Sequence, residues 1–70
     1  MVAPFSRPAR RRMRQRGISE AEVAAVLATH YSRRRDPRGN DVLIGRVAGR
    51  RVKVVVDNRT GPPEIVTVAD

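Results

Sequence analysis

Arginine is the residue type in this chain best suited to chemistry, because a guanidinium binds phosphate oxygens through paired hydrogen bonds. The sequence holds 15 Lys and Arg residues against 7 Asp and Glu, a formal net charge of +8 on 70 residues. A small domain with this excess repels itself, which favours a polyanionic partner. Nucleic acid is the first candidate, because each cation that neutralises a phosphate releases a condensed counterion. A GC-rich genome would explain Arg in place of Lys, but not the excess of cations over acids.

The cations fall into three groups. They lie in a first helix candidate (Arg7, Arg10, Arg11, Arg12, Arg14, Arg16), in a loop (Arg33, Arg34, Arg35, Arg38) and on a hairpin candidate (Arg46, Arg50, Arg51, Lys53). We expect Arg46, Arg51 and Lys53 to bind nucleic acid on one sheet face, beside Thr67, with Arg33, Arg34 and Arg35 as a flanking clamp. Because only 3% of the residues are aromatic, the composition predicts contacts to the phosphate backbone rather than stacked bases.

Histidine is the side chain that titrates nearest neutrality, and His30 is the only one in the chain. It is therefore the candidate proton shuttle, although a cation at a helix C-terminus also simply stabilises the helix. The sequence has no cysteine, no metal-ligand spacing, no nucleotide-binding glycine loop and no nucleophile elbow. We expect neither a metal nor a cofactor.

Two helices are predicted in the first half of the chain. Residues 1–7 form a lead-in, and a helix over about 8–16 begins with Pro8 in its first turn and ends before Gly17. Ser19 and Glu22 match a capping box, which predicts a second helix over about 19–30. Its apolar stripe follows a helical spacing: Val23, Val26, Leu27, His30 and Tyr31.

The second half of the chain alternates with a period of two, which predicts strands over about 42–48, 51–57 and 64–68. A type II′ turn at Gly49-Arg50 would set Arg46 opposite the like charge of Lys53. The residues expected on the buried face are Leu43, Val47, Val52, Val54, Val56, Val66 and Val68, with Ile65 and Thr67 on the basic face. Residues 33–35 could add a short strand. The predicted fold is one α+β domain over residues 1–70, with two helices on one face of a three- to four-stranded antiparallel sheet.

This order of elements resembles the RelE-like toxins of bacterial toxin–antitoxin systems, most closely their BrnT-like branch and a related family of small domains of unknown function. The resemblance spans about residues 5–68 and is carried by RMRQRGISEAEV (12–23), GRVAGRRVKVVVD (45–57) and IVTV (65–68). It implies a cytoplasmic, metal-independent endoribonuclease, a hydrolase that cleaves mRNA, often on the ribosome, and that an antitoxin inhibits. Arg46 and Arg51 would stabilise the pentacoordinate phosphate, and His30 would transfer the proton.

Two positions depart from the pattern of the related small domains. Pro8 stands where those domains carry a histidine, and Ala69 where they carry an aromatic residue. A second hypothesis is therefore a non-catalytic RNA- or DNA-binding module with the same fold. A third is an interaction protein that docks Arg10, Arg11 and Arg14 on an acidic partner such as an antitoxin. No apolar stretch is long enough for a membrane helix, so we expect a cytoplasmic protein with no membrane partner; the oligomeric state is open.

Overall fold

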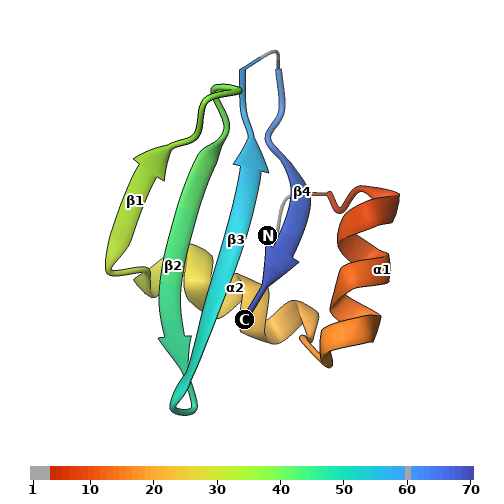
Figure 1. The fold of residues 1–70 in the computed structure, drawn as a ribbon, viewed down its shortest axis with the longest axis vertical. Helices are drawn as coiled ribbons and strands as arrows, with labels where there is room; N and C mark the ends of the chain where they lie inside the picture. The colour runs from red at the N-terminus through yellow and green to blue at the C-terminus, as the bar shows by residue number, and fades with distance from the viewer. Residues whose placement is uncertain (1–3, 60) are drawn as a thin grey trace.

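The computed structural model describes residues 4–59 and 61–70. The elements follow in the order α1 (Arg7–Arg16), α2 (Glu20–Thr29), β1 (Ser32–Arg35), β2 (Asp41–Val47), β3 (Arg50–Asp57) and β4 (Glu64–Ala69). The strands form one antiparallel sheet in the order β1-β2-β3-β4. Figure 1 shows α2 behind the sheet and α1 beside β4. The predicted α+β fold is confirmed, and residues 32–35 add the strand β1 to the three strands predicted in the second half of the chain.

The hydrophobic core lies between the helices and one face of the sheet. Its buried members are Ala9, Met13, Ile18, Val23, Val26, Leu43, Val52, Val54, Val56, Ile65 and Val68. Gly45 lies under α2, where an added Cβ would meet three atoms of Val26 at 3.4 Å. The absence of a side chain at this position therefore lets α2 pack closely on β2.

The helix ends confirm the predicted capping signals. The Ser19 hydroxyl accepts from the Glu22 backbone N–H at 3.1 Å, and the Glu22 carboxylate accepts from the Ser19 N–H at 2.9 Å. Gly17 ends α1 in the left-handed conformation, with φ of 64°. Tyr31 is instead 61% exposed and lies outside the predicted stripe. The chain leaves the helix at His30, and the Tyr31 N–H donates to the Ile44 carbonyl at 2.9 Å.

The hairpin turn lies at Ala48-Gly49, one residue before the predicted position. Both residues have positive φ, 52° and 80°, as a type I′ turn requires. Val47 therefore faces Arg50, and the predicted pair of Arg46 with Lys53 is wrong. The reason is tertiary, because as a strand residue Arg50 reaches the carbonyls at the end of α1. The register differs by two positions, so the residues of β2 and β3 keep the faces predicted for them.

The turn offers a test of this register. Ala48 adopts a left-handed conformation that asparagine tolerates much better than alanine. Ala48→Asn should raise the free energy of unfolding by about 0.5–1 kcal/mol, measured by urea denaturation. The same change at Ala28, exposed on α2, should lower stability, because asparagine is a poorer helix former. A loss of stability at both positions would contradict the positive φ of Ala48.

A β-bulge in β4 changes which of its side chains are buried. Val55 pairs with Thr67 and Val56 with Ile65, so Val66 is the extra residue. Ile65 is fully buried in the core, whereas Val66 packs on the opposite face. The predicted positions of Ile65 and Val66 are therefore wrong, and that of Val68 is confirmed.

The segment before α1 pairs with the outer edge of β4. The Ile65 N–H donates to the Pro4 carbonyl at 2.8 Å, and the Ser6 N–H donates to the Ile65 carbonyl at 2.9 Å. The predicted lead-in over residues 1–7 therefore includes three paired residues at 4–6 and the first residue of α1, while residues 1–3 lie outside the described part. These bonds to both sides of Ile65 hold the bulge in place.

Candidate nucleic-acid interface

The sheet face turned away from the helices, here called the outer face, is turned toward the viewer in Figure 1. Alternate residues of the strands form it, because directly opposed residues share a face. They are Ser32, Arg34, Val42, Ile44, Arg46, Arg51, Lys53, Val55, Val66, Thr67 and Ala69. No helix in the described part of the chain contacts this face, since α2 packs on the other side of β2 and β3 and α1 packs against β4.

The outer face gathers most of the predicted phosphate-binding residues. Arg46 lies opposite Arg51, and Lys53 lies between Ile44 and Ala69 on the neighbouring strands. The like-charge pair is therefore Arg46 with Arg51. Among residues 4–59 and 61–70, no ion pair involves Arg34, Arg46, Arg51 or Lys53. Their charge is thus not neutralised by a neighbouring carboxylate.

The predicted Arg33–Arg35 clamp is split by the alternation of β1. Arg34 shares the outer face with Val42, but Arg33 and Arg35 lie on the other side. There they form ion pairs with the nearly buried carboxylate of Asp41 at 3.4 and 3.7 Å. Asn58 donates to the same carboxylate at 2.6 Å. We therefore assign Arg33 and Arg35 to holding Asp41 at the start of β2.

His30 lies apart from the outer face. It ends α2, which packs on the opposite side of the sheet, and its side chain is half-buried. Its Nδ1 lies 3.2 Å and 3.3 Å from the carbonyl oxygens of Val26 and Leu27. The ring thus satisfies carbonyls at the helix end. The structure does not bring this residue together with Arg46 and Arg51.

The arginines predicted to bind a protein partner lie on α1 and form a second basic surface. Arg10, Arg11 and Arg14 are all exposed. The Arg10 guanidinium pairs with Glu20 at 3.4 Å and lies 5.0 Å from the centre of the Phe5 ring. These residues share no face with Arg46 or Arg51.

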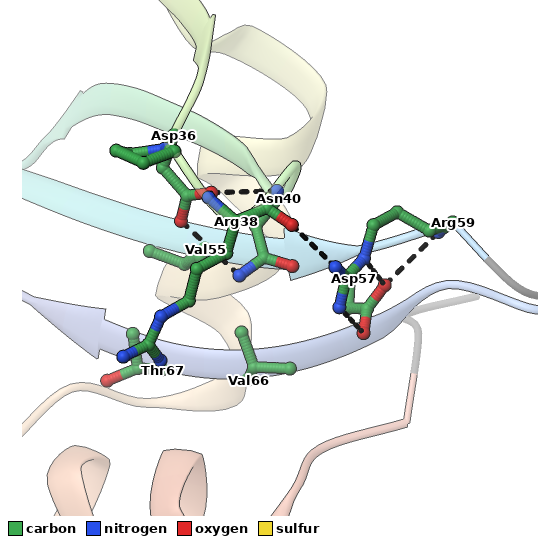
Figure 2. A pocket seen from close by; sticks show the side chains of 9 residues that line it. Asp36, Arg38, Asn40, Val55, Asp57, Arg59, Val66 and Thr67 are labelled. Atoms are coloured by element: carbon green, nitrogen blue, oxygen red, sulfur yellow. Dashed lines mark hydrogen bonds and ion pairs between the residues drawn. The ribbon is translucent and has the colours of Figure 1, made fainter.

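A pocket that the sequence did not predict lies at the end of the outer face remote from the hairpin turn (Figure 2). Its volume is about 490 Å³, and its lining is Asp36, Pro37, Arg38, Asn40, Val55, Asp57, Arg59, Val66 and Thr67. The lining comes from three segments that meet only through the strand register and the bulge. No local signal could have shown that they meet.

The acids of this pocket are held by neighbouring groups. Side-chain and backbone hydrogen bonds from Arg59 lower the pKa of Asp57. Desolvation raises the pKa of Asp36, but N–H donors of Asn40 and Arg38 outweigh it, so the net pKa is lowered. Asp36 and Asp57 each accept backbone N–H groups of the residues that follow them, so both carboxylates stabilise turns. Both carboxylates are ionised at neutral pH and already accept hydrogen bonds from neighbouring N–H groups.

Comparison with known proteins places the chain in a family without an assigned activity. No helix in the described residues is long and apolar enough to cross a membrane. Neither a curated protein nor a solved structure matches the chain, so the relation to RelE-like and BrnT-like toxins stays a prediction. A family model matches residues 5–70, and the chain therefore belongs to the family described as Domain of unknown function (DUF4258).

Proposed function

We propose that the protein binds RNA through its outer face. The observation that carries this proposal is the set of cations on an uncovered sheet face, none of which has a carboxylate partner among the described residues: Arg34, Arg46, Arg51 and Lys53. Arg46 and Arg51 are directly opposed residues, and the Arg46 guanidinium also donates to the Gly49 carbonyl at 3.3 Å. Like charges on opposed residues repel each other, and a phosphate bound by both would turn that repulsion into two attractions.

The shape of this surface favours RNA over duplex DNA. A broad sheet face does not fit the major groove of B-DNA, which admits a helix or a two-stranded ribbon. Sheet faces do bind single-stranded RNA. Lys53 and Arg51 lie about 7 Å apart along β3, a spacing that lets them contact different phosphates. The resemblance to RelE-like toxins adds support for RNA as the nucleic acid.

Cleavage of the bound RNA is the second candidate, favoured by the two cations on the opposed residues Arg46 and Arg51. It also needs a group that accepts the 2′-hydroxyl proton. Asp70 lines a small pocket with Arg51 and Lys53. A hydrogen bond from Arg50 at 2.7 Å lowers the pKa of that carboxyl, which makes it a weak base. The geometry thus supports phosphate binding better than proton transfer.

The binding proposal is tested by the salt dependence of RNA affinity, measured by fluorescence anisotropy with a labelled single-stranded RNA. Arg46→Gln/Arg51→Gln should weaken binding. It should also make the negative slope of the log association constant against log salt concentration shallower by about 1.4, at about 0.7 per phosphate contact. The control Arg7→Gln/Arg12→Gln removes the same charge from α1. Equal losses in the two double variants would mean that net charge, not the outer face, binds the RNA.

Cleavage is tested separately in a cell-free translation reaction whose mRNA ends are mapped. New codon-positioned ends that disappear with Arg51→Ala would establish a ribosome-dependent nuclease. Intact mRNA at high protein concentration would exclude that activity and leave the binding proposal to the anisotropy experiment.

A further inference from the structure

We infer that the pocket in Figure 2 binds one nucleobase, while the cations of the outer face hold the phosphates of the same strand. That the base belongs to an RNA strand rests on the proposed function. The pocket itself would bind the base of a free nucleotide equally well. The pocket and the cations share one face of the sheet. Val55 in the pocket lies about 7 Å along β3 from Lys53 and about 13 Å from Arg51.

The floor of the pocket suits the flat apolar face of a base. Val55 and Val66 form it, and they pack with Val42 and Ile44 as a second apolar cluster on the outer face. The volume of about 490 Å³ lies within the range of sites that hold small ligands. Such sites combine an apolar lining with a few fixed polar groups, and the same combination occurs here.

The polar wall of the pocket is fixed and offers an unused acceptor. Asn40 is 9% exposed, and its Nδ2 donates to the Asp36 carboxylate at 3.3 Å. Its Oδ1 is buried and finds no hydrogen-bond donor among the described residues. A buried acceptor without a partner costs stability until a donor is supplied. The ring N–H or amino group of a base is such a donor.

The two arginines of the pocket have different tasks. The Arg59 side chain forms one side of the pocket and is held in place, because it pairs with Asp57 at 3.2 Å and donates to the Arg38 carbonyl. No ion pair in the described part of the chain involves the Arg38 guanidinium, and Figure 2 shows this side chain extending toward β4 across the pocket. A free guanidinium in this position can stack on a base, as arginine does in RNA complexes. The pocket thus replaces the aromatic platform that the composition lacks.

The test fills the pocket and compares two polyanions. Val66→Phe should lower the affinity for a single-stranded RNA about ten-fold, because a stacked base contributes on that scale. The affinity for inorganic polyphosphate, which has phosphates but no bases, should stay unchanged. Val66→Ile is the matched control and should preserve both affinities. Equal effects of Val66→Phe on the two polyanions, or no effect on either, would overturn the base pocket and leave phosphate binding standing.

A titration of the wild-type protein with mononucleotides, followed by NMR, needs no variant. Shift changes confined to the pocket residues Asn40, Val55, Val66 and Thr67 would support the base site even if the protein binds no RNA. That result would separate failure of the proposed function from failure of the pocket. Shift changes absent from these residues at saturating nucleotide would overturn the inference.

Discussion

Ile65→Ala lowers the free energy of unfolding by about 3 kcal/mol, whereas Val66→Ala beside it costs about 1 kcal/mol. Ile65 is fully buried in the core, so its truncation leaves a cavity between the helices and the sheet. Val66 is half-buried on the outer face and leaves a surface depression instead. Domains of this size have about 5 kcal/mol of stability in total, so the first change brings the protein close to unfolding.

Urea denaturation of the two variants and the wild type measures this difference. The plain alternation of β4, without a bulge, predicts the opposite order, because it buries Val66 and exposes Ile65. A larger loss at Val66 than at Ile65 would therefore contradict the bulge at Val66, which lies opposite the step from Val55 to Val56.

Arg50→Gln lowers the free energy of unfolding by about 1–3 kcal/mol, while Arg51→Gln leaves it nearly unchanged and weakens RNA binding. The Arg50 guanidinium donates to the carbonyls of Arg16 and Gly17 and to the Asp70 carboxylate, and it pairs with Glu22 at 3.7 Å. It therefore joins α1, α2, β3 and the end of the chain. Arg51, on the opposite side of β3, has only the like charge of Arg46 across from it.

Thermal unfolding and RNA anisotropy on the same two variants give a crossed result if these roles are right. Arg50→Gln should lose thermal stability and keep its RNA affinity at temperatures where it is folded. Arg51→Gln should do the reverse. Two variants with the same profile would show that adjacent arginines of β3 do not serve different faces.

Local signals allowed the helices to be predicted from sequence. The capping box at Ser19 and Glu22 and the left-handed Gly17 depend on residues within four positions of each other, so tertiary structure does not overrule them. The buried face of the hairpin was also predictable. A period of two assigns each residue to one face of the sheet, even when the residue opposite it on the neighbouring strand is predicted wrongly. That is why Arg46, Arg51 and Lys53 share a face despite the wrong turn.

The misplaced features depend on contacts between distant residues. The bonds of Arg50 to the end of α1 favour the turn at Ala48-Gly49, and the bonds of Ile65 to the segment before α1 favour the bulge at Val66. No pattern within β3 or β4 contains that information. The pocket depends on both, which explains why its lining was not foreseen. The placement of Arg34 on the face opposite Arg33 and Arg35 was predictable, because it follows from the alternation of any regular strand over residues 32–35.

The pairing of residues 4–6 with β4 sets the order in which the protein can fold as it is synthesised. The Ser6 hydroxyl donates to the Val66 carbonyl, 60 positions along the chain, and α1 packs against β4. Contacts of such long sequence separation slow folding, because the chain must close a large loop before they form. While β4 is still inside the ribosome, α1 has no surface to pack on. We expect the domain to remain unfolded until the last strand emerges, and then to fold as a single unit.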